Sequence, residues 1–84
     1  MQFSSPTCAP CERVRAVCAE VVSGAEGVRH VEIDVAVDLD QARAYGVWRV
    51  PTLLVVDPLG RIVRRAVGVP RRGDLQAAIA EVMA

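Results

Sequence analysis

The run Thr52-Leu53-Leu54-Val55-Val56 constrains the fold more than any other stretch of this sequence. It lacks the polar–apolar alternation of a half-exposed strand and consists of β-branched residues and leucine, which is typical of a central strand buried on both faces. A strand of this kind needs other elements packed against both faces of its sheet. We therefore expect a layered α/β fold.

Helical patterns are present on both sides of this run. An apolar stripe at helical spacing predicts a helix from Cys8 to about Ser23. Asp38 can cap a short helix that is stopped by Gly46. A last amphipathic helix is expected to start at Pro70.

Three further strands complete the expected sheet. Residues 1–3 are a short strand fragment, and residues 28–34 alternate between apolar and polar side chains. Residues 61–67 follow a turn at residues 57–60, and their Arg-rich alternation is typical of an exposed edge strand. The expected order is β-α-β-α-β-β-α, in a compact, mixed four-stranded sheet with helices on both faces.

The chain has 84 residues, of which 52% are hydrophobic, so we expect a single domain that spans residues 1–84. No apolar run reaches the ~18 residues of a membrane span, and no secretory pattern precedes Cys8. We expect a cytoplasmic monomer, or the soluble domain of a longer, membrane-anchored protein. The net charge is zero, so a nucleic-acid partner is not expected.

The arginines are unevenly distributed along the chain. Residues 43–72 hold seven Arg against Asp57 alone, whereas residues 12–40 hold seven acidic residues against three Arg. Two interpretations are open. The basic segment is either a docking patch for an acidic partner or, more commonly, a set of solvated strand and loop faces.

Cys8 and Cys11 form a C-x-x-C pair, which can close a reversible disulfide, supply half of a metal site or simply pack in a core. A structural zinc site normally has four ligands, and the only further candidates are Cys18 and His30. We therefore expect neither a metal nor a cofactor. Three cysteines are fewer than a small secreted disulfide scaffold usually contains, which favours a reducing compartment.

The surroundings of the pair favour redox chemistry. Residues 4–7 are turn-prone and the helical pattern starts directly after them, so Cys8 is expected at a helix N-terminus. Free N–H groups and the positive end of the helix dipole stabilise a thiolate there, which makes Cys8 the expected nucleophile. Cys11 lies one turn further on, where it can attack a mixed disulfide on Cys8. Pro10 fixes the backbone between the two thiols.

The motifs FSSPTCAPC (residues 3–11) and YGVWRVPT (residues 45–52), followed by Gly60 and Gly68, resemble the thioredoxin superfamily, most closely its small redoxins. The resemblance covers nearly the whole chain. It implies a thiol–disulfide oxidoreductase that reduces protein disulfides through Cys8 and Cys11, with a reductase or a low-molecular-weight thiol as electron donor.

The same resemblance implies a cis peptide bond before Pro51, which leaves the backbone of Val50 free to bond an extended substrate segment. The substrate-binding residues that it implies are Thr7, Ala9, Pro10, Trp48, Val50 and Pro51.

Several positions depart from the thioredoxin pattern. Gln2 stands where thioredoxin has a buried Asp six residues before the first Cys, Thr7 replaces the usual Trp, and Glu12 replaces the usual Lys. His30 is expected at the place of a Lys near that Asp, where it either tunes the thiols or is a half-exposed strand residue. These changes leave the proton acceptor for Cys11 open.

The roles of two other residues, and the function of the whole chain, each have more than one possible interpretation. Cys18 is a third redox thiol or a small buried hydrophobe, and Trp48 contacts substrate or covers the edge of the core. The alternative functions are a metal-binding or metal-delivery module, a redox-inert interaction domain and a glutathione-dependent glutaredoxin. The last is disfavoured, because Pro10 and a single Gly68 stand where glutaredoxins usually have an aromatic residue and a Gly-Gly pair.

Overall fold

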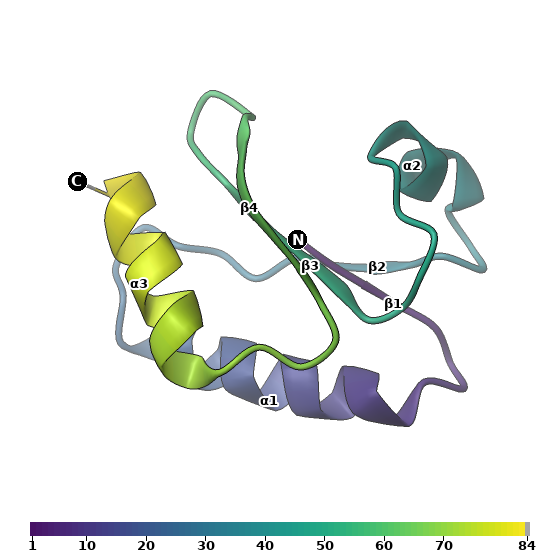
Figure 1. Cartoon of the computed structure of the whole chain (residues 1–84), viewed down its shortest axis with the longest axis horizontal. Helices are drawn as coiled ribbons and strands as arrows, with labels where there is room; N and C mark the ends of the chain where they lie inside the picture. The colour runs from purple at the N-terminus through teal and green to yellow at the C-terminus, as the bar shows by residue number, and fades with distance from the viewer. Residues whose placement is uncertain (84) are drawn as a thin grey trace.

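The computed structural model describes residues 1–83, which form one sheet and three helices (Figure 1). Their order along the chain is β-α-β-α-β-β-α, as predicted. The strands are β1 (Gln2–Ser4), β2 (Glu32–Asp34), β3 (Thr52–Val56) and β4 (Ile62–Val67), and the helices are α1 (Ala9–Ser23), α2 (Leu39–Ala44) and α3 (Arg72–Met83).

The four strands pair in the order β2-β1-β3-β4. β1 is parallel to β2 and antiparallel to β3, and β3 is antiparallel to β4. β3 is therefore a central strand and β4 an edge strand, as predicted. β2 is shorter than the predicted strand over residues 28–34, because β1 offers only Gln2–Ser4 as partners and these pair with Glu32–Asp34.

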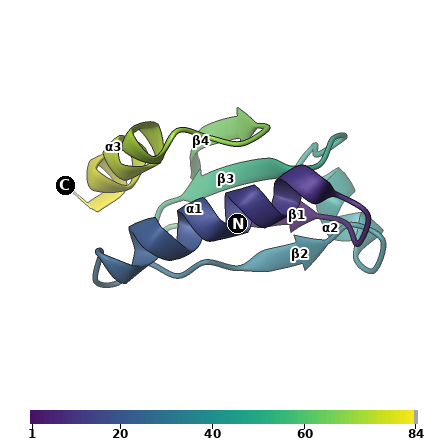
Figure 2. The same cartoon turned by 90° about the horizontal axis from the view of Figure 1, so that it is seen from below.

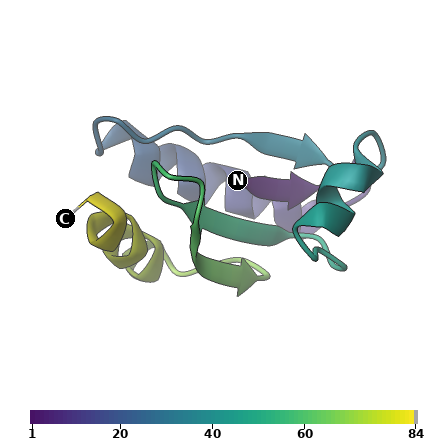
Figure 3. The same ribbon diagram turned by 90° about the horizontal axis from the view of Figure 1, so that it is seen from above.

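Helices cover both faces of the sheet, as expected (Figures 2 and 3). α1 and α3 pack on one face, and α2 lies on the other. Two apolar clusters result, one on each side of β3. The first consists of Val14, Cys18, Val21, Leu53, Leu75 and Ile79, and the second of Phe3, Ile33, Ala42, Val47 and Leu54. Since Leu53 and Leu54 point into different clusters, β3 needs apolar residues at successive positions.

The helices begin close to their predicted starts. Cys8 is the N-cap of α1, and the Asp38 side chain caps α2 by accepting a hydrogen bond from the N–H of Gln41 (3.2 Å). α3 begins at Arg72 instead of Pro70, because Pro70 belongs to the segment that leaves β4 and the Arg71 carbonyl accepts the N–H of Leu75. Among residues 1–83, no helix has the length and apolar character that crossing a membrane requires.

Candidate active site

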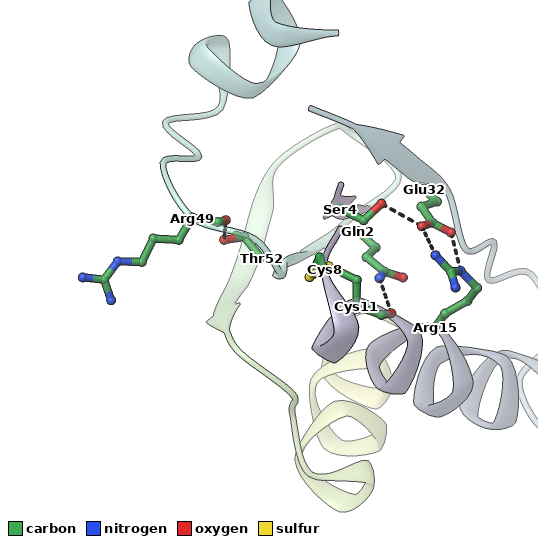
Figure 4. Close-up of a disulfide and its surroundings, with 8 residues drawn as sticks. All are labelled: Gln2, Ser4, Cys8, Cys11, Arg15, Glu32, Arg49 and Thr52. Atoms are coloured by element: carbon green, nitrogen blue, oxygen red, sulfur yellow. Dashed lines mark hydrogen bonds and ion pairs between the residues drawn. A yellow bond between two sulfur atoms is a disulfide. The ribbon is translucent and has the colours of Figure 1, made fainter. Parts of the chain in front are cut away.

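Cys8 and Cys11 are joined by a disulfide at the N-terminus of α1, with their Cα atoms 5.3 Å apart (Figure 4). Cys8 is partly exposed, whereas Cys11, in the first helical turn, is only 1% exposed. No side chain caps the helix at Cys8, and Pro10 contributes no N–H to the first turn. The positive end of the helix dipole therefore acts on the Cys8 sulfur without a competing cap, and it favours a thiolate once the disulfide is reduced.

The sheet register brings the second sequence motif to the same edge. Phe3 in β1 pairs with Thr52 in β3, so the chain that leaves β1 toward Cys8 lies beside the chain that enters β3. The peptide bond between Val50 and Pro51 is cis, as expected, and Pro51 is buried. Figure 4 shows this loop next to the disulfide.

Two hydrogen bonds hold the loop on either side of Val50. The Thr52 hydroxyl donates to the carbonyl of Arg49 (2.6 Å), and the N–H of Gly68 donates to the carbonyl of Pro51 (2.9 Å). The N–H and C=O of Val50 form no hydrogen bond with any residue between 1 and 83. A donor and an acceptor are thus held in a fixed position beside the disulfide.

The other residues expected to bind substrate are at the surface of this edge. Thr7 and Ala9 are exposed and Pro10 is half-buried around Cys8. Trp48 is 81% exposed, so it does not cover the edge of the core. The structure therefore brings the two motifs together, with the side chains of the first motif around the disulfide and Trp48 in the loop of the second.

Gln2 is completely buried beneath the disulfide. Its amide Nε2 donates to the carbonyl oxygen of Cys11 (2.9 Å), and its Oε1 lies 2.8 Å from Nε2 of His30. Because an amide oxygen only accepts, neutral His30 carries its proton on Nε2 and donates it to Gln2. Gln2 has no titratable proton, so it cannot accept the proton of Cys11 as a carboxylate would.

His30 precedes β2 and is half-buried, with its ring linked to the backbone of Cys11 through Gln2. Burial lowers the pKa of His30 below its usual 6.5, and the nearby ammonium group of Met1 lowers it further. The imidazole is therefore neutral at pH 7. The ring is linked to α1 only indirectly, because it bonds to Gln2 and Gln2 bonds to the carbonyl of Cys11. It makes no direct hydrogen bond to a sulfur.

A charged network beside Gln2 joins α1 to the sheet. The Glu32 carboxylate accepts hydrogen bonds from Nε of Arg15 (2.7 Å) and from the hydroxyl of Ser4 (2.7 Å). These bonds lower the pKa of Glu32 to about 2, and the bond from Arg15 contributes most. Partial burial acts in the opposite direction and raises the pKa, but its effect is smaller. No local sequence pattern predicts this network, because its partners are 17 and 28 positions apart.

Cys18 is buried, with 3% of its surface exposed, and burial raises the pKa of its thiol. It is a member of the cluster between α1, α3 and β3, which agrees with its interpretation as a small hydrophobe. Within residues 1–83, no group of three or more His, Cys, Asp or Glu side chains could hold a metal ion. The reactive arrangement that the structure shows is the Cys8–Cys11 disulfide.

Comparisons with known proteins agree with this arrangement. The family model for thioredoxin matches residues 1–81. The thioredoxin of Bacillus subtilis (strain 168) is 35% identical over 75 residues, which are 88% of this chain and 71% of that protein.

Solved structures of thioredoxins superpose closely on the chain. A mutant thioredoxin from Halobacterium salinarum NRC-1 has a TM-score of 0.85 and 29% identity, over 99% of this chain and 72% of its own. Thioredoxin NaTrxh from Nicotiana alata has a TM-score of 0.83 and 30% identity, over 96% of this chain and 69% of its own. These matches show that the chain belongs to the thioredoxin family, and because its C-x-x-C cysteines form a disulfide, it is a thiol–disulfide oxidoreductase.

Proposed function

We propose that Cys8 is the attacking thiol and Cys11 the resolving thiol in the reduction of protein disulfides. The Cys8 thiolate attacks one sulfur of the substrate disulfide and forms a mixed disulfide with it, and the other substrate sulfur leaves first, as a thiolate. Cys11 then attacks the Cys8 sulfur, which releases the second substrate sulfur. Two electrons pass to the substrate, and the protein is left with the Cys8–Cys11 disulfide.

The observation that carries this division of labour is the difference in exposure between the two cysteines. Cys8 is partly exposed at the uncapped end of α1, and Cys11 is 1% exposed one turn inside it. A substrate protein can therefore reach only the sulfur of Cys8, and the helix dipole favours the thiolate form of Cys8. The buried Cys11 sulfur can react with Cys8 because their Cα atoms are 5.3 Å apart.

The proton of Cys11 goes, in this proposal, to the first substrate thiolate or to solvent. Gln2, the polar side chain bonded to the Cys11 carbonyl, offers no titratable group, and neutral His30 donates its Nε2 proton to Gln2. The proton transfer that frees Cys11 therefore depends on groups outside the buried layer, and the leaving thiolate is the strongest base available at that moment.

The substrate segment that carries the disulfide is proposed to pair with Val50. The free N–H and C=O of Val50 support this, since they can bond an extended chain as the first pair of an antiparallel ladder. Thr7, Ala9, Pro10, Trp48 and Pro51 would then form the surface against which that segment packs. N-methylation of successive amides in a model substrate should slow its reduction at one position near the cysteine, and equal rates at every position would contradict pairing through Val50.

For regeneration we propose a reductase as the electron donor, with the protein acting as a monomeric domain of residues 1–84 in the cytoplasm. The departure from the glutaredoxin pattern at Pro10 and Gly68 supports a protein donor over glutathione. The rate of regeneration by a flavoprotein reductase with NADPH, compared with that by glutathione, tests this choice. Faster regeneration by glutathione would contradict it.

A single-turnover experiment tests the proposed function itself. Fully reduced protein is mixed with a small cystine peptide, and free thiols are counted on both partners. We expect the loss of two protein thiols and the gain of two peptide thiols, with Cys18→Ala behaving as the native chain and Cys8→Ser inactive. No peptide reduction, or stoichiometric binding of zinc by the reduced pair, would instead favour a metal-binding module.

A further inference from the structure

Residues 45–51 connect α2 to β3 and include Val50, whose free N–H and C=O form the proposed contact with substrate (Figure 1). We call these residues the α2–β3 loop. The chain of β4 holds this loop near both of its ends. At the end next to β3, the N–H of Gly68, which directly follows β4, donates to the carbonyl of Pro51 (2.9 Å). At the end next to α2, the contact is made by the side chain of Arg65, a residue within β4.

The guanidinium of Arg65 bonds to the C-terminus of α2. It donates to the carbonyl of Tyr45, the C-cap of the helix (2.7 Å), and makes a longer bond to the carbonyl of Gly46 (3.4 Å). No other donor among residues 1–83 bonds to these two carbonyls. The C-terminus of a helix carries partial negative charge, so a cation that donates hydrogen bonds is favourable there. Arg65 therefore caps α2 and ties the start of the α2–β3 loop to β4.

The alternation of side chains along β4 gives its two adjacent arginines different partners. Arg65 is opposite Leu54, which enters the cluster on the α2 face of the sheet, and Arg64 is opposite Val55, which packs against the cluster on the other face. Arg64 accordingly forms an ion pair with Glu81 of α3 (2.7 Å). Arg64 thus ties β4 to α3, and Arg65 ties it to the α2–β3 loop.

The bond from Arg65 matters because α2 is weakly held by packing. The helix has six residues, and Ala42 is the only one of them that is buried. The next anchor, Val47, is buried in the core, but its N–H donates to the carbonyl of Ala42 (2.8 Å), so its position is coupled to that of α2. A short element with little buried surface opens easily. A charged hydrogen bond from the sheet therefore limits the movement of α2 and of the loop that follows it.

The geometry points to Arg65 as a positioning residue for substrate recognition, which holds the α2–β3 loop so that Val50 meets an extended substrate segment beside the disulfide. This inference rests on the proposed function, because it concerns the pairing of substrate with Val50. Arg65 acts through the loop and not on the sulfurs. Loss of its bonds should therefore slow the reduction of a disulfide within a polypeptide, and it should not slow the reduction of a small disulfide that has no backbone to pair.

Three variants test this inference. Arg65→Met removes the donors and keeps most of the aliphatic stem. Arg65→Lys keeps the charge but replaces the planar fork by a single ammonium group, so it should restore part of the contact. Arg64→Met is the matched control, because it removes an exposed arginine and its ion pair from the neighbouring position of the same strand.

Each reduced protein is mixed with an extended cystine peptide and, separately, with hydroxyethyl disulfide. The readout is the ratio of the two second-order rate constants, which cancels any change in the reactivity of Cys8. An exposed charge at a helix C-terminus is a modest interaction, so we expect Arg65→Met to lower this ratio by about 3-fold. Arg65→Lys should lower it by less, and Arg64→Met should leave it within about 1.5-fold of the native value.

Trp48 provides a second readout, because it is the only tryptophan of the chain and lies in the α2–β3 loop with 81% of its surface exposed. Its fluorescence anisotropy should fall in Arg65→Met, since loop motion on the nanosecond timescale reorients the ring, and it should stay unchanged in Arg64→Met. If Arg65→Met does not fold, the same two measurements on Arg65→Lys and Arg64→Lys decide.

An unchanged ratio of rate constants in the Arg65 variants, an equal fall in the Arg64 control, or an unchanged Trp48 anisotropy would overturn the inference. Failure of the proposed function looks different, because the native protein would then reduce neither the peptide nor hydroxyethyl disulfide.

Discussion

Replacement of Glu32 by Gln should remove a charge that holds α1 against the sheet. The carboxylate of Glu32 accepts hydrogen bonds from Arg15 in α1 and from Ser4 in β1. Together these bonds lower the pKa of Glu32 from 4.5 to about 2. Gln has the same size and keeps one acceptor oxygen, so the substitution tests the charge and changes little of the packing.

The magnitude follows from this pKa difference. A displacement from 4.5 to about 2 corresponds to at most ~3.4 kcal/mol at ~1.36 kcal/mol per pH unit. The side chains of Arg15 and Glu32 are 47% and 30% exposed, so solvent screens much of their interaction. We therefore expect Glu32→Gln to lower the free energy of unfolding at pH 7 by ~1 kcal/mol.

The sign of the pH dependence is fixed because the folded state has the lower pKa. The stabilisation is fully present above pH ~4.5, where the unfolded state has also lost its proton, and it disappears as the pH falls through about 2. The native and variant proteins should therefore differ at pH 7 and converge toward pH 2.

Urea unfolding of the oxidised protein at several pH values between 2 and 7 measures this convergence. Glu26→Gln is the matched control, because Glu26 is exposed and forms no hydrogen bond with a residue in the described chain. A difference between native protein and Glu32→Gln that stays constant with pH would refute the electrostatic reasoning and point to a packing effect.

Three further outcomes are expected. Alkylation of the oxidised protein should leave Cys18 unmodified until denaturant is added, because Cys18 is 3% exposed and burial raises its pKa; rapid labelling of the native protein would show that the thiol is accessible. Asp38→Ala should lower the free energy of unfolding by about 1 kcal/mol, because the Asp38 side chain caps α2. Asp38→Ser should lower it much less, because Ser can also cap a helix. Equal losses for the two variants would mean that the cap does not contribute. Equilibration with a dithiol buffer should give a potential nearer ~−270 mV than ~−120 mV, because Ala9 and Pro10 place no charge or side-chain donor between the sulfurs, and a value above about −200 mV would contradict this.

Local patterns in the sequence were sufficient to predict the elements that form the frame of the site. The unbroken run of residues 52–56 predicted a central strand, and its two adjacent leucines do enter different clusters. The turn before Cys8 predicted that this residue starts a helix, and it is the N-cap of α1. Both predictions depend on residues within a few positions of one another, which is why they could be read from the chain directly.

Contacts between distant residues could not be predicted in this way. The strand before Asp34 was expected from Val28, but its length is set by the three residues that β1 offers as partners. His30 was associated with the active site only through the family resemblance. Its actual link runs through the amide of Gln2 to the carbonyl of Cys11, and the orientation of that amide is visible only in three dimensions.

Trapping of the mixed disulfide tests the central proposal most directly. Reduced Cys11→Ser and Cys8→Ser variants are each mixed with a disulfide-bonded substrate, quenched with acid and analysed by peptide mapping and mass spectrometry. We predict that Cys11→Ser accumulates a covalent adduct through Cys8 and that Cys8→Ser accumulates none, because Cys11 is only 1% exposed. An adduct through Cys11 in the Cys8→Ser variant, with none in Cys11→Ser, would reverse the assigned roles.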